Sequence, residues 1–375
     1  MTLLRFAATA FAVSLCSSLA LAQAPSPNEI LLGQSVDLSG PASPRQKLLK
    51  EASDAYIRSV NAKGGVNGRK IRVISLDNKG NKDETVATIN QLVDKDKVMG
   101  IYMMSGTANV TAVLPYLQEN KVPLFGITSG TVSLRKHNPY LYHYKASYGD
   151  ELAKMAEHLS TVGIQRVGII YLRSSFGKEN LGAAEAALAG RNLQVIAKAE
   201  VAESGEDAPA AAAIVAKAKP QAVVLVSVSG TAPKIVSAYR ALDEKAMLLG
   251  LSVLSSDLLY KELGDKARGT IIAQTVPYPW DRSTRIVAEY QDTMKAMGVK
   301  DISVAGMEGY LSARILVEAL KTGGRGVTRE SLIRVLDNTG EQNLGGYRYA
   351  FTPTDHNGSK YVDITLIGRG GRLQR

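Results

Sequence analysis

Apolar segments of strand length alternate with amphipathic segments of helical length along most of this chain, and this alternation constrains the fold more than any other feature. A connection that contains a helix is long enough to cross over between parallel strands, so each unit favours a parallel sheet covered on both faces. In the first part of the chain we expect strands at residues 29–39, 70–77, 98–104 and 122–127, separated by helices at 44–63, 83–94 and 109–119.

The pattern starts again after Tyr144, which predicts a second α/β domain of similar size. The expected helices there are residues 149–160, 175–190, 207–219 and 232–242, and the expected strands are 166–172, 193–201 and 222–228. Two further helices and two terminal strands joined by turn residues follow, at 284–297, 304–320, 346–351 and 361–367. No long linker separates the two halves.

The first residues have the composition of a secretory signal peptide. Arg5 provides the positive charge, an apolar stretch follows, and Ala22 completes a small-x-small cleavage site before Gln23. A transmembrane anchor is disfavoured because small residues and serines weaken the stretch and no charge follows it to stop transfer. A lipoprotein is disfavoured because Leu15, directly before Cys16, is too large for such a site. We therefore expect an exported, soluble protein.

Charge and cysteine content limit the possible functions. Removal of the signal peptide would remove Cys16, the only cysteine, and would exclude thiol catalysis and cysteine-bound metal. The formal net charge is +10, and loss of Arg5 would leave 10 − 1, about +9. The basic residues are interleaved with acidic ones except in "GRGGRLQR", residues 368–375. A solvated surface is therefore favoured over nucleic-acid binding, and an anionic ligand is compatible with this charge.

Motifs for catalysis and cofactor binding are absent from the sequence. No GxGxxG follows an expected strand, and neither GxxxxGK[ST] nor GxSxG occurs. The histidines are scattered and form no metal-binding pair; they are His137, His143, His158 and His356. We expect a protein that is not an enzyme and that has no metal and no cofactor.

Two polar loops follow neighbouring strands, "MSGTANV" at 104–110 and "GITSGTVSL" at 126–134. Ligands of open parallel sheets bind outside the carboxyl ends of the strands, where these loops lie. Gly106 and Gly130 allow close approach of the backbone, and hydroxyl and free N–H groups at a helix start favour an anion such as a carboxylate. Simple N-capping by Ser105 or Thr107 is the alternative for either residue alone.

Six segments of the sequence together resemble the leucine/isoleucine/valine-binding branch of the periplasmic binding proteins, the type I solute receptors of ABC importers. The segments are "GQSVDLSGP", "NAKGGVNGRKIRVISLDN", "MSGTAN", "VPLFGITSGTVSLR", "SSFGKENL" and "DHNGSKYVDITLIG", in this order along nearly the whole chain. The resemblance implies an α/β fold of two doubly wound parallel-sheet lobes, joined by a three-segment hinge, that close on a solute. The run at 61–78 would then be scaffold that connects the first crossover helix to the second strand.

Domain boundaries follow from the resemblance. After the signal peptide, residues 1–22, the first lobe would comprise 24–145 and 281–343, and the second lobe 146–277 and 346–375. The hinge crossings are expected near Lys145–Gly149, Val276–Trp280 and Asn343–Tyr347.

The resemblance also implies ligand-binding residues. The cradle for the ligand's carboxylate and amino group would consist of Ser105, Gly106, Thr107, Thr128, Ser129 and Thr131. Phe176 stands where family members place an aromatic ring over the ligand, and Ser229 begins the matching loop of the second lobe.

Two positions depart from the family pattern. Ser252 stands where amino-acid receptors commonly have an acidic residue, and Arg45 lies near a position that is often aromatic. These changes suggest a ligand with less positive charge than a plain amino acid. Tyr278 either lines the cleft mouth or is a buried hinge aromatic, and Glu308 is expected on a solvated helix face rather than in the cleft.

The sequence therefore predicts a monomeric periplasmic receptor that captures a small carboxylated solute, such as a branched-chain or other amino acid, for an ABC permease. A receptor for an organic or aromatic carboxylate is the first alternative. An exported ligand-sensing module of the same fold is the second, because it requires the same cleft.

Overall fold

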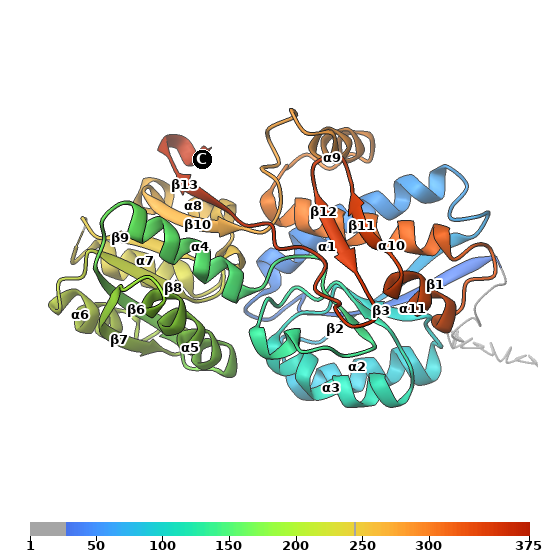
Figure 1. Cartoon of the computed structure of the whole chain (residues 1–375), viewed down its shortest axis with the longest axis horizontal. Coiled ribbons are helices and arrows are strands. Elements are labelled where there is room, and N and C mark those ends of the chain that lie inside the picture. Colours follow the sequence, from blue (N-terminus) through green and yellow to red (C-terminus); the bar gives the residue numbers. More distant parts are fainter. Residues whose placement is uncertain (1–27, 244) are drawn as a thin grey trace, which may run out of the picture.

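A computed structural model describes residues 28–243 and 245–375, which form two α/β lobes (Figure 1). The predicted signal peptide and Cys16 lie outside these residues. In the part of the chain that the structure describes, no helix combines the length and apolar character needed to cross a membrane.

The first lobe is built on a parallel sheet of order β2-β1-β3-β4-β5. Its strands are β1 (Glu29–Val36), β2 (Lys70–Asp77), β3 (Gly100–Tyr102), β4 (Leu124–Phe125) and β5 (Leu141–Tyr142). The helices of this lobe are α1 (Ser43–Ala62), α2 (Lys82–Asn90), α3 (Thr107–Glu119), α9 (Arg285–Ala296), α10 (Val304–Thr322) and α11 (Arg329–Asp337). A π-helical turn at Gln91–Lys95 extends α2. Strands β11 (Gly340–Asn343) and β12 (Arg348–Phe351) form a hairpin beside α1 and α10.

The second lobe is built on a larger sheet of order β14-β13-β10-β9-β8-β6-β7. Its strands are β6 (Arg166–Leu172), β7 (Gln194–Val201), β8 (Ala222–Val226), β9 (Met247–Gly250), β10 (Thr270–Gln274), β13 (Asp363–Ile367) and β14 (Leu373–Gln374). Its helices are α4 (Tyr148–Thr161), α5 (Ser175–Ala189), α6 (Ala208–Lys217), α7 (Ala232–Arg240) and α8 (Ser256–Leu263). The interior strand β8 is buried along its whole length, as expected for a sheet covered on both faces. At one edge, β13 pairs antiparallel with β10 and β14 with β13.

The described chain crosses between the lobes along three segments, one between β5 and α4, one between β10 and α9, and one between β12 and β13 (Figure 1). The first two include residues expected in the hinge. The third differs from the expectation, because Asn343 ends β11 and residues 344–347 form the turn of the β11–β12 hairpin. Gly345 and Gly346 both have positive φ there, which allows the chain to reverse within the first lobe.

The true third crossing begins further along the chain. Gly358 donates its N–H to the carbonyl of His143, and His143 donates its N–H to the carbonyl of His356. These bonds hold the chain against the first lobe as far as Gly358. Residues 346–358, which the resemblance places in the second lobe, therefore belong with the first.

Candidate ligand-binding site

A pocket of about 170 Å³ lies between the lobes, at the carboxyl edges of both sheets. The first lobe contributes the loops after β1, β2, β3 and β4, and the second lobe contributes the loops after β6, β7, β8 and β9. This is the position at which open parallel sheets bind ligands. The principal lining residues are Asp37, Gln46, Ser105, Gly106, Thr107, Thr128, Ser129, Tyr148, Phe176, Glu203, Val228 and Val253.

The hydroxyl loops expected from the sequence meet at this pocket. The Thr107 hydroxyl lies 2.9 Å from that of Ser129 and 2.8 Å from that of Thr131. Helix α3 begins at Thr107, so the N–H groups of its first turn have no hydrogen-bond acceptor within the helix. These groups lie at the pocket. Gly106 has φ 86°, and a Cβ at this residue would lie 2.8 Å from the Asn109 side chain. Ser105, Gly106, Thr107, Thr128 and Ser129 line the pocket, whereas Thr131 is buried behind them.

Gln46 and Asp37 also line the pocket from the first lobe, and no specific sequence signal indicates either residue. The Gln46 amide nitrogen donates to the Thr128 hydroxyl at 3.2 Å. The two carboxylate oxygens of Asp37 accept the backbone N–H groups of Gly40 and Ala42, and so fix the loop between β1 and α1.

The second lobe supplies mainly apolar contacts. Phe176 lies in the first turn of α5, where Ser174 caps the helix by accepting the Gly177 N–H at 3.2 Å. The Phe176 ring packs edge-on against Tyr148, with ring centroids 5.5 Å apart. Glu203 places an exposed carboxylate at the rim. No lysine, arginine or histidine is among the described residues that line this pocket.

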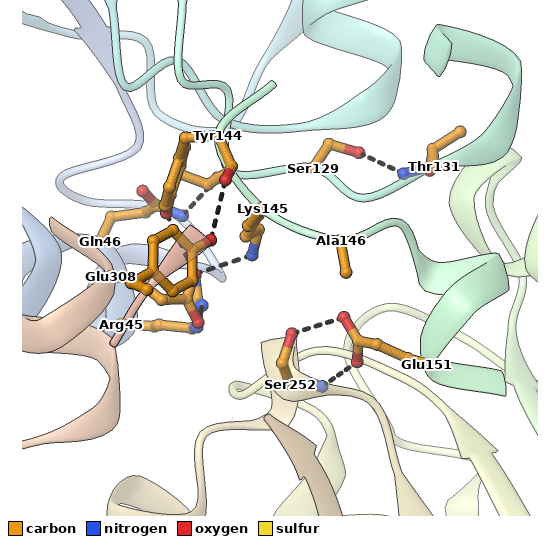
Figure 2. A network of polar contacts seen from close by, with 12 residues as sticks. Arg45, Gln46, Ser129, Thr131, Tyr144, Lys145, Ala146, Glu151, Ser252 and Glu308 are labelled. Carbon is orange, nitrogen blue, oxygen red and sulfur yellow. Dashed lines mark hydrogen bonds and ion pairs between the residues drawn. The ribbon is translucent and has the colours of Figure 1, made fainter. Parts of the chain in front are cut away.

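Arg45 does not line the pocket but belongs to a buried ion network beside it (Figure 2). Its Nη2 lies 2.6 Å from Glu308 Oε1, and Lys145 Nζ lies 2.7 Å from Glu308 Oε2. Burial raises the pKa of Glu308, but the two neighbouring cations outweigh this effect and hold the pKa below the ordinary value. The expectation that Glu308 lies on a solvated helix face is therefore wrong, because its side chain is fully buried between these cations.

Ser252 also lies outside the pocket lining. Its backbone N–H and hydroxyl donate to the two carboxylate oxygens of Glu151, at 2.7 and 2.8 Å (Figure 2). Glu151 is buried in the first turn of α4, and burial raises its pKa to about 7. The fold thus brings an acidic group to Ser252 from an element that is 101 positions away in sequence.

The remaining expected site residues lie apart from the pocket lining. Ser229 is buried next to Val228, which does line the pocket. Tyr278 is half-buried near the second crossing, where its hydroxyl donates to the Leu373 carbonyl at 3.1 Å. No group of histidine, cysteine, aspartate and glutamate side chains in the described ranges could hold a metal ion.

The two lobes touch across the cleft. On one side, the Glu179 carboxylate of α5 accepts the Ser133 N–H at 2.6 Å and the Ser133 hydroxyl at 2.8 Å. At the start of α10, the Val304 N–H donates to Asp257 of α8 at 3.1 Å. A Cβ at Gly230 would lie 2.5 Å from the Pro41 carbonyl oxygen. The structure therefore corresponds to a closed arrangement of the lobes.

Comparison with known proteins gives one consistent result. The family model described as periplasmic binding protein matches residues 29–372. The Leu/Ile/Val-binding protein homolog 3 of Brucella melitensis is 23% identical over 300 residues, which cover 79% of this chain and 78% of that protein. A receptor-type adenylate cyclase of Trypanosoma brucei brucei, ESAG 4, is 30% identical over only 81 residues, and the match spans 7% of its length.

Solved structures agree with the family match. The substrate-binding periplasmic protein from Ralstonia solanacearum is 30% identical, with a TM-score of 0.86 over 92% of this chain and 99% of that one. A branched chain amino acid ABC transporter structure from Thermus thermophilus with bound valine has a TM-score of 0.84 at 21% identity, over 92% and 94% of the two chains. This second match shows a shared fold.

Proposed function

Because the chain belongs to the periplasmic binding protein family, we propose that it captures a small amino acid between its lobes and delivers it to an ABC permease. The relatives support this role, since one is named a Leu/Ile/Val-binding protein homolog and one fold neighbour is an ABC transporter structure with bound valine. The signal peptide, with cleavage near Ala22, would export the protein to the periplasm. The protein would act there as a receptor and not as an enzyme.

The observation that carries the amino-acid assignment is the lining of the pocket. Hydroxyl groups and the N–H groups at the start of α3 provide neutral donors for a carboxylate. The charged side chains that line the pocket, Asp37 and Glu203, are both acidic. Such a lining suits a zwitterion, because a carboxylate is held by neutral donors while an ammonium meets acceptors and negative charge.

An organic or aromatic carboxylate without an amino group is the second candidate. In the sequence, the positive charge of Arg45 and the absence of an acid at Ser252 favour such a ligand. Arg45 is neutralised by Glu308, and Ser252 is paired with Glu151, so neither change adds positive charge to the pocket lining. These pairs favour the amino acid.

Thermal unfolding with matched ligand pairs tests the proposal. L-leucine is compared with 4-methylpentanoate and L-valine with 3-methylbutanoate, since each acid lacks only the amino group, and the other small amino acids complete the panel. A ligand at about 100 times its Kd adds about 2.7 kcal/mol to apparent stability. We expect an amino acid to raise Tm more than its matched acid does. Stabilisation by the acids alone would overturn the assignment.

A further inference from the structure

We propose that Gln46 holds the ammonium group of the ligand through its amide oxygen, in the role that a carboxylate commonly fills. This inference rests on the proposed amino-acid ligand and assigns one of its two polar ends to a residue. The burial of Gln46, the orientation of its amide and the engagement of the nearby acids support this assignment.

Gln46 extends from α1 into the pocket lining and is 4% exposed. Its amide nitrogen donates to the Thr128 hydroxyl, and this arrangement leaves the amide oxygen available as an acceptor. The amide oxygen is buried and has no hydrogen-bond partner among the described residues. An unsatisfied buried acceptor is costly, so a donor supplied by the ligand would stabilise the complex. Among the described residues that line the pocket, only Gln46 has such an atom.

The bond to Thr128 also prepares a site for the other end of the ligand. Because the Thr128 oxygen accepts from Gln46, its own hydrogen is free to donate elsewhere. A donor for a carboxylate and an acceptor for an ammonium thus stand side by side. An α-amino acid carries these two groups on one carbon atom, so a single Gln46–Thr128 pair can engage both.

The neighbouring acids are less suited to the ammonium. Each carboxylate oxygen of Asp37 already accepts a backbone N–H, and Glu151 is bonded to Ser252 outside the pocket lining. The Glu203 carboxylate is exposed at the rim, where water competes for it. A neutral amide adds no charge of its own to the cleft, and a zwitterion has zero net charge.

Titration calorimetry on the full mature protein separates Gln46 from Glu203. The probes are L-leucine, L-valine and their matched acids, together with any amino acid that stabilises the protein in the thermal panel. Gln46→Met keeps the length of the side chain and removes the amide. Since a hydrogen bond to a charged group is at stake, we expect Gln46→Met to weaken amino-acid binding about tenfold or more, with a smaller effect on any matched acid.

Two further variants complete the test. Gln46→Glu retains an acceptor, so its affinity for the amino acid should stay within about threefold of wild type. This result would also show that position 46 tolerates substitution, so that misfolding need not explain a loss of binding in Gln46→Met. Glu203→Gln tests the competing acid at the rim, and it should weaken amino-acid binding less than Gln46→Met does. Wild-type affinity in Gln46→Met, or a tenfold loss in Glu203→Gln, overturns the assignment to Gln46. If wild type binds no amino acid at all, the proposed function fails, and the assignment falls with it.

Discussion

At the scale of single residues, Glu308 is the group on which the buried charges beside the pocket depend. It compensates both Arg45 and Lys145, and burial lowers the pKa of Lys145 despite the attraction of Glu308. Glu308→Gln would leave two buried cations without a counter-charge, so we expect a loss of about 3–5 kcal/mol of unfolding free energy. Urea unfolding of wild type and Glu308→Gln at neutral pH measures this loss.

The same helix provides a control for Glu308. Glu318 forms ion pairs with Arg314 and Lys321 near the surface, so Glu318→Gln should cost less than about 1 kcal/mol. Equal effects of the two substitutions would show that burial does not determine the loss of unfolding free energy.

The pKa of Glu308 is lowered in the fold. The contribution of Glu308 to stability is therefore present above the ordinary glutamate pKa and is lost as pH falls through the lowered pKa.

The residues of the hydroxyl loops could be predicted because strand ends and small polar residues are visible locally. Their placement at the pocket follows from the sequence, whereas ligand binding by them remains a prediction. The environment of Arg45 could not be predicted, because its partner Glu308 lies 263 positions away and only the packed fold joins them. The same holds for Ser252 and Glu151.

At the scale of elements, the crossing of α1 and α10 holds Gln46 and the ion network in position. The helices meet at Gly309, where a Cβ would lie 2.0 Å from the Leu49 carbonyl oxygen. Gly309→Ala would therefore force the helices apart, and we expect a loss of about 1–3 kcal/mol or more together with weaker ligand binding. Thermal unfolding and calorimetry measure the two effects.

Gly182 is the matched control for this helix contact. It lies inside α5 with no heavy atom within 4 Å of the position that a Cβ would occupy. Gly182→Ala should therefore stabilise the protein by about 0.4–1 kcal/mol, because alanine restricts the unfolded chain. Tolerance of alanine at both positions would contradict the close packing of α1 on α10.

Elements with strong local patterns could be predicted, and short ones could not. Strand β6 lies at the expected residues, Arg166–Leu172, because its apolar run is bounded by clear turns. Strand β5 consists of Leu141–Tyr142 and is too short for a periodic signal. The two terminal strands were expected together, but β12 pairs with β11 in the first lobe and β13 with β10 in the second. Local sequence does not specify this long-range pairing.

At the scale of the whole molecule, the contacts between the lobes connect ligand capture to closure. Glu179 and Asp257 of the second lobe each accept a backbone N–H from the first lobe, at separate places along the cleft. Contacts of this kind form only when the lobes meet, so a ligand that bridges the pocket shifts the equilibrium toward the closed form.

Gly230, which is not among the pocket-lining residues, allows the closed form to be destabilised. It lies in the second lobe, and its Cα faces the Pro41 carbonyl of the first lobe so closely that a Cβ would lie 2.5 Å from that oxygen. Gly230→Val would clash only when the lobes close. We expect the free energy of unfolding without ligand to be unchanged. The apparent affinity for the ligand should fall in proportion to the loss of the closed population. The radius of gyration measured by X-ray scattering should no longer decrease when ligand is added. Gly326→Val is the control, since no heavy atom lies within 4 Å of a Cβ there. A Gly230→Val protein that still contracts and binds as wild type does would show that ligand binding tolerates separation of the lobes at this contact.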